Sequence, residues 1–179
     1  MPAIAHVGVG FAAKKIAPNI SVIYLIIAAE LIEIVFFIFV AAGVETMPLP
    51  DKSPYAPYSH SVIMAIIWAV VGVLFTFLIT KNKKVSIIIG LLVLSHTILD
   101  IIASPKLAFY PTDTKLPVFI NDSLTVGLGL FKYKALALIS EFGILIAGFI
   151  IYILTIRNAK VQKHLLVFIH YMVVTIFFY

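Results

Sequence analysis

The chain has 179 residues, of which 63% are hydrophobic and 12% charged, and its 13 Lys and Arg residues outnumber its 8 Asp and Glu residues. A soluble domain of this size needs far more charge to cover its surface, so the composition indicates an integral membrane protein. The absence of cysteine excludes disulfides and thiolate metal sites. In a membrane protein the basic excess reports topology, and we expect no nucleic-acid partner.

Apolar stretches follow one another along the chain. The first thirteen residues are too few to span a bilayer and precede Lys14 and Lys15, so they predict a short helix that dips into the membrane or lies at its interface. Spans of about 20 residues are then predicted at residues 20–44, 61–80, 85–103 and 135–156, with a marginal fifth at 165–179. The predicted fold is an all-α polytopic transmembrane helix bundle of 4–5 spans with a short N-terminal apolar helix, forming one domain over residues 1–179.

Basic residues set the expected orientation. Eight of the 13 fall on one side of this model, and no acidic residue accompanies them. By the positive-inside rule this side is cytoplasmic, which predicts a multi-pass cell-membrane protein with basic loops in the cytoplasm. The eight residues are Lys14, Lys15, Lys81, Lys83, Lys84, Arg157, Lys160 and Lys163.

The third predicted span carries His96 and Asp100 one helical turn apart. An ionisable residue near the middle of a spanning helix costs roughly 2.5–3.5 kcal/mol on insertion scales, so such residues usually pair or bind an ion. Counting about 1.5 Å per residue from the basic clusters places further polar groups at a similar depth. Glu30, Glu33 and Glu141 are expected at about the depth of His96 and Asp100, which together define a polar slab of the membrane. His60 is expected somewhat closer to the outer surface, and His6 closer to the cytoplasmic surface.

Imidazole and carboxylate ligands suit a divalent transition metal, with zinc, manganese and iron as the options. Such an ion lowers the pKa of bound water, which can then attack an ester or phosphodiester. Asp100 alternatively accepts a hydrogen bond from His96 and orients it. For Glu30 and Glu141 a structural role in hydrogen bonding between helices has equal weight. His164 and His170 are expected to be interfacial or packed.

Four segments carry a family resemblance. They are His6 followed by Ala13-Lys14-Lys15-Ile16-Ala17-Pro18, then Pro57-Tyr58-Ser59-His60-Ser61, Ser95-His96-Thr97-Ile98-Leu99-Asp100, and Gly127-Leu128-Gly129-Leu130 followed by Glu141. In this order, from His6 to about Tyr152, the chain resembles a bacterial and archaeal family of membrane-bound metal-dependent hydrolases. The resemblance implies a divalent metal, in first place zinc, held by His96, Asp100, His60, Glu33 and His6, with Glu141 and Asp100 as candidate catalytic residues.

The chain also departs from the family pattern. Glu33 stands where an aspartate is usual, and Phe131 replaces a tryptophan. A His-x-Pro-Asp-Leu segment is common after the His96 motif, whereas this chain has Ala103-Ser104-Pro105-Lys106-Leu107. If that segment supplies ligands or a base in the family, part of the site is missing here.

Three functions follow from these observations. The first is a metal-dependent hydrolase acting on a lipid or other amphiphilic ester or phosphodiester that enters from the outer leaflet. The alternative is a non-catalytic structural or accessory subunit of a larger membrane complex, whose polar residues bond helices together. A small transporter or ion pathway is a third reading. The expected partners are membrane lipid and other membrane protein subunits.

Overall fold

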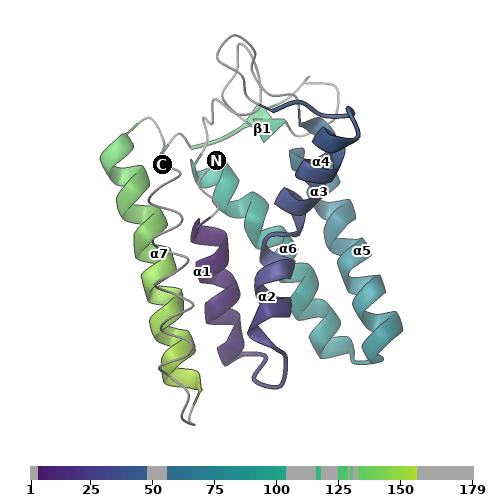
Figure 1. Cartoon of the computed structure of the whole chain (residues 1–179), viewed down its shortest axis with the longest axis vertical. Coiled ribbons are helices and arrows are strands. Elements are labelled where there is room, and N and C mark those ends of the chain that lie inside the picture. The colour runs from purple at the N-terminus through teal and green to yellow at the C-terminus, as the bar shows by residue number, and fades with distance from the viewer. Residues whose placement is uncertain are drawn as a thin grey trace.

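Helices make up most of the computed structural model, which describes residues 4–47, 56–103, 116–117, 125–128, 130 and 133–156 (Figure 1). Two short strands, β1 (Leu116–Pro117) and β2 (Thr125–Val126), pair antiparallel. The helices are α1 (Ile4–Ala12), the 3-10 turn η1 (Ala13–Lys15), α2 (Val22–Ala29), α3 (Leu31–Ala41), α4 (Pro57–His60), α5 (Val62–Thr80), α6 (Lys83–Ala103) and α7 (Lys134–Thr155).

Three of these helices, α5, α6 and α7, are long and apolar enough to cross a membrane. They match the spans predicted at residues 61–80, 85–103 and 135–156. The span predicted at residues 20–44 is not one continuous helix, because α2 and α3 meet at a break on Glu30 and are bent by 60°. As a pair they form a fourth candidate span. The fifth candidate, residues 165–179, lies outside the described residues.

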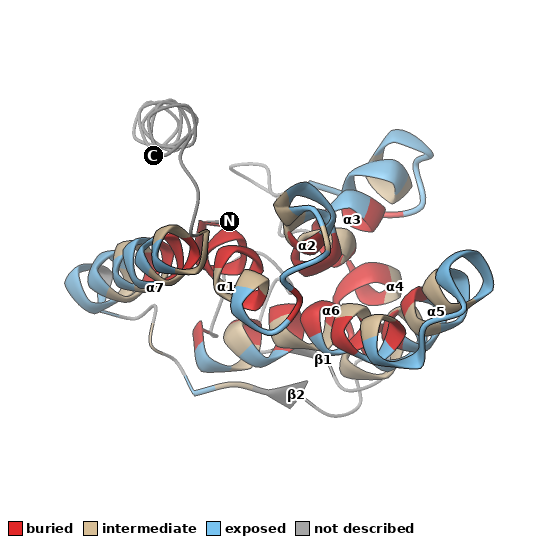
Figure 2. Cartoon of the chain, turned by 90° about the horizontal axis from the view of Figure 1, so that it is seen from below, coloured by how far each residue is buried: buried red, intermediate tan, exposed pale blue. Residues whose placement is uncertain are grey.

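Helix α1 is buried between α7 and α2, where it runs alongside α7 (Figures 1 and 2). Whether this helix dips into the membrane or lies at its interface stays a prediction. Glycines make this insertion possible. A Cβ on Gly8 would lie 2.5 Å from the Ile144 carbonyl oxygen, and one on Gly10 would lie 2.8 Å from Ile26 Cα. Close backbone approach at small residues is typical of helix packing in membranes.

The outer faces of α5 and α7 carry large exposed apolar side chains (Figure 2). Phe75, Leu78 and Ile79 are each 65–66% exposed. Because contiguous apolar surface of this kind is rare on soluble monomers, it is consistent with helices that contact lipid. Buried apolar residues instead form three clusters: one between η1, α2 and α6, one between α1 and α7, and one between α3, α5 and α6.

Candidate metal centre

Helix α6 supplies two residues of the centre. His96 and Asp100 are both fully buried, and four residues of helix bring them onto one face. His96 Nε2 lies 3.6 Å from Asp100 Oδ2. The predicted convergence of this imidazole and this carboxylate is therefore present.

Helix α1 adds His6, which is 2% exposed. Its ring stacks on the ring of His96, with centroids 3.8 Å apart and planes 9° from parallel. His6 Nε2 lies 3.7 Å from Asp100 Oδ1. The expectation that His6 lies below the polar slab is wrong, because α1 is inserted along α7 and carries His6 to the level of Asp100.

Helices α3 and α4 complete the centre with Glu33 and His60. His60 Nε2 lies 3.2 Å from Glu33 Oε2 and 4.0 Å from Asp100 Oδ2. Glu33 Oε2 also lies 3.9 Å from His96 Nε2. His60 was expected somewhat above the other residues, but α4 turns it into direct contact with them.

These side chains form two groups that could each hold a metal ion, namely His6 with His96 and Asp100, and Glu33 with His60 and His96. Because His96 belongs to both groups through its Nε2 atom, the geometry points to one centre. Ligands about 2.1 Å from a zinc ion in tetrahedral arrangement stand about 3.4 Å apart. The nitrogen–oxygen separations above, from 3.2 Å to 4.0 Å, fall around this value.

The His96 ring is held by a backbone carbonyl. Its Nδ1 lies 3.0 Å from the Ala29 oxygen, and since a carbonyl oxygen only accepts, Nδ1 carries the proton. The break at Glu30 explains why this carbonyl is available. Ala29 ends α2, and the last carbonyls of a helix lack an intrahelical partner. His96 Nε2 is therefore the ring nitrogen that faces the carboxylates and is left to bind a metal.

His60 is oriented by a longer chain of hydrogen bonds. The Ser59 hydroxyl donates to Glu45 Oε2 at 2.7 Å, and its oxygen accepts from His60 Nδ1 at 2.7 Å. Glu45 Oε1 in turn accepts the backbone N–H groups of Tyr58 and Ser59, at 2.7 Å and 2.9 Å. This arrangement leaves His60 Nε2 as the ligand atom, in the way that outer partners orient metal-bound histidines.

Glu45 and Ser59 were not identified as functional from the sequence. Glu45 is nevertheless 1% exposed and Ser59 is fully buried. The only available signal was the position of Ser59 directly before His60. Nothing in the periodicity of the chain indicated that Glu45, 14 residues earlier, would fold back onto it.

Glu141 belongs to α7, and its carboxylate contacts the N-terminus of α1. Its Oε2 accepts the backbone N–H of Ala5 at 3.0 Å, and a carboxylate there satisfies an end donor and complements the helix dipole. This contact fixes the turn that carries His6. Among the described residues neither Glu141 nor Glu30 belongs to the two ligand groups, and a catalytic role for Glu141 stays a prediction. His164, His170 and residues 104–107 lie outside the described residues.

Comparison of the chain with protein-family models, with curated proteins and with solved structures finds no match. The site is therefore argued from its own geometry. The structure brings together all five residues that were predicted as metal ligands.

Proposed function

We propose that this chain is a multi-pass membrane protein that binds one divalent transition metal through His6, Glu33, His60, His96 and Asp100. One observation carries the proposal. Three imidazole Nε2 atoms and two carboxylates, from four helices, form five nitrogen–oxygen pairs that are 3.2–4.0 Å apart. Nitrogen and oxygen ligands favour zinc, with manganese and iron as alternatives, and two carboxylates match the charge of a divalent ion.

We further propose hydrolysis of an amphiphilic ester or phosphodiester as the reaction. A divalent metal held in this way supplies a water-derived nucleophile at neutral pH. The protein's own part is to keep the ligand atoms in place: Ala29 and Ser59 hold the two histidine rings. Asp100, whose carboxylate oxygens lie 3.6–4.0 Å from three imidazole Nε2 atoms, would bind the metal from the face of α6. The resemblance to membrane-bound metal-dependent hydrolases supports this reaction class.

Burial favours a second candidate, a structural or accessory subunit. The five side chains are between 0% and 8% exposed, which is typical of a closed structural metal site rather than one with an open position. The centre also ties together α1, α3, α4 and α6, which are distant along the chain. In this case the metal would stabilise the bundle and no reaction would follow.

The decisive experiment is metal analysis of the purified full chain. We expect one zinc per chain in the wild type, and a large loss in His96→Ala and Glu33→Gln. Glu30→Gln is the matched control, because Glu30 lies three residues from Glu33 and outside both ligand groups. A wild type without stoichiometric metal would refute metal binding.

Activity then separates the two candidates. The zinc-loaded protein in mixed micelles is assayed with p-nitrophenyl butyrate and bis(p-nitrophenyl) phosphate as probes. Hydrolysis that requires zinc and is absent from the metal-depleted His96→Ala variant supports the enzyme. Full zinc occupancy, a large loss of thermal stability on chelation and no hydrolysis support the structural subunit instead.

A further inference from the structure

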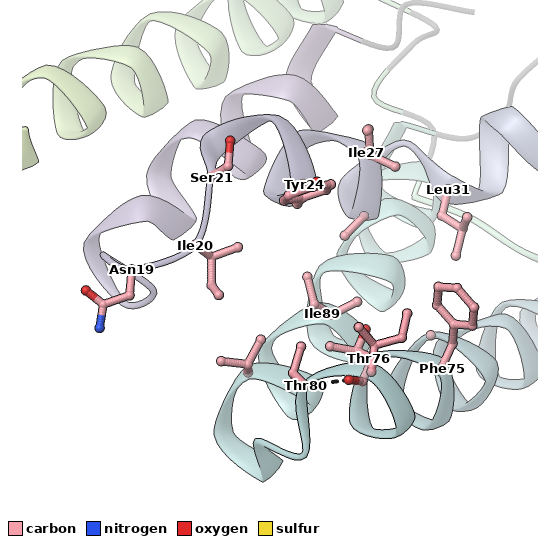
Figure 3. A pocket seen from close by; sticks show the side chains of 14 residues that line it. Asn19, Ile20, Ser21, Tyr24, Ile27, Leu31, Phe75, Thr76, Thr80 and Ile89 are labelled. Carbon is pink, nitrogen blue, oxygen red and sulfur yellow. Dashed lines mark hydrogen bonds between the residues drawn. The ribbon is translucent and has the colours of Figure 1, made fainter.

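A second feature lies away from the metal centre, near the end of the bundle that carries the basic loops. An elongated groove with a volume of about 540 Å³ runs between α2 and the adjoining ends of α5 and α6 (Figure 3). Tyr24 and Ile27 form one wall, and Phe75 and Ile79 form the other. These four side chains are between 44% and 66% exposed, so the groove opens sideways on the face that would contact the bilayer.

The dimensions of the groove match one leaflet. Its α5 wall extends from Gly72 to Thr80, and eight residues of helix rise about 12 Å. The hydrocarbon of one leaflet is about 15 Å thick, half of a core of about 30 Å.

Lysines lie next to lining residues at the shallow end. The Lys14 ammonium donates to the Ile20 carbonyl oxygen at 2.5 Å, and Ile20 lines the groove. Lys81, which follows α5, and Lys83, the first residue of α6, are exposed and lie along the chain between the lining residues Thr80 and Val85. The sequence contains no Asp or Glu in residues 10–29 or 70–90, so nothing acidic in these segments offsets the lysines.

We propose that this groove binds an acyl chain of an anionic phospholipid, whose headgroup phosphate is held by the lysines at its shallow end. An apolar channel as deep as one leaflet fits a hydrocarbon tail, and the basic rim distinguishes an anionic headgroup from a zwitterionic one. Lysines near an anionic membrane surface each strengthen binding by about fivefold. The inference rests on the proposed membrane location and is independent of metal binding.

Photo-crosslinking tests the proposal. The full chain is reconstituted into phosphatidylcholine vesicles with trace phosphatidylglycerol or phosphatidylcholine that carries a diazirine in its acyl chain. Labelled positions are then mapped by mass spectrometry. We expect the phosphatidylglycerol probe to label the groove walls, including Tyr24 and Phe75, in preference to the outward face of α7. The phosphatidylcholine probe should label both surfaces equally.

Two pairs of variants sharpen the result. Thr76→Trp places a large ring in the groove and should abolish the preferential labelling. Leu74→Trp, on an exposed residue of α5 outside the groove, should leave it unchanged. Lys83→Gln should lower the phosphatidylglycerol preference about fivefold, whereas Lys83→Arg should retain it.

Three outcomes overturn the proposal. These are equal labelling of the groove by both probes, preferential labelling that survives Thr76→Trp, and crosslinks from the groove to a second copy of the chain or to another protein. Because exposed Lys83 is not packed in the core, its variants remain informative if Thr76→Trp fails to fold. Zinc content measured in the same samples shows whether the metal proposal fails separately.

Discussion

Ser59 offers the sharpest test of how the metal centre is built. Its hydroxyl links His60 Nδ1 to Glu45 through two hydrogen bonds of 2.7 Å, and it is fully buried. In Ser59→Ala the backbone contacts of Glu45 remain, but His60 Nδ1–H loses its acceptor. A buried donor left without a partner costs about 1–3 kcal/mol. This penalty destabilises the orientation of the His60 ring in which Nε2 can bind the metal. The zinc affinity should therefore fall by about 10-fold to 100-fold.

Ser61 provides the matched control on the other side of His60. It caps the N-terminus of α5 by accepting the Met64 N–H at 3.4 Å. Ser61→Ala should therefore lower the stability of the protein by about 1 kcal/mol while leaving zinc affinity unchanged. Both affinities are measured by competition with a chromophoric chelator in detergent. If Ser59→Ala binds zinc as tightly as the wild type, or if Ser61→Ala weakens binding equally, the orienting role of Ser59 is wrong.

Three further predictions concern stability and activity. Gly148→Ala should destabilise the fold by about 1–3 kcal/mol, because the added Cβ would overlap the Gly8 carbonyl. Gly143→Ala is the control and should not destabilise it, because a Cβ there has open space around it. Equal thermal midpoints of the two variants would contradict the packing of α1 on α7. Removing zinc with a chelator should lower the thermal midpoint, since free metal at 100 times its Kd stabilises by about 2.7 kcal/mol, and His96→Ala should show no such response. Glu141→Gln should lower the free energy of unfolding by about 0.3–1 kcal/mol, because it removes a negative charge from the N-terminus of α1, and the variant should still bind zinc. Loss of zinc would contradict the role of Glu141 at this helix end. Loss of hydrolysis with zinc retained would assign Glu141 to catalysis.

Much of the helical arrangement was predictable, because apolar stretches of bilayer length are visible in composition alone. The predicted ligands were also accessible, since an ionisable side chain in an apolar stretch needs a physical reason. The break at Glu30 was not predictable, because the sequence from Val22 to Ala41 is apolar and helix-forming on both sides of it. The packing role of Gly8 was not predictable either, because its partner Gly148 lies 140 residues away along the chain.

The sequence by itself determined that the chain is helical and rich enough in apolar residues to enter a membrane. Apolar stretches of bilayer length and the cost of buried charge suffice for these conclusions and for singling out His96 and Asp100, whereas the full set of five candidate ligands came from the family resemblance. Only the tertiary structure decided how deep His6 lies, which carbonyl holds His96, and that Glu45 reaches His60 through Ser59. Each of these depends on contacts between residues distant in the chain, and such contacts are set by how close two backbones can approach rather than by local pattern.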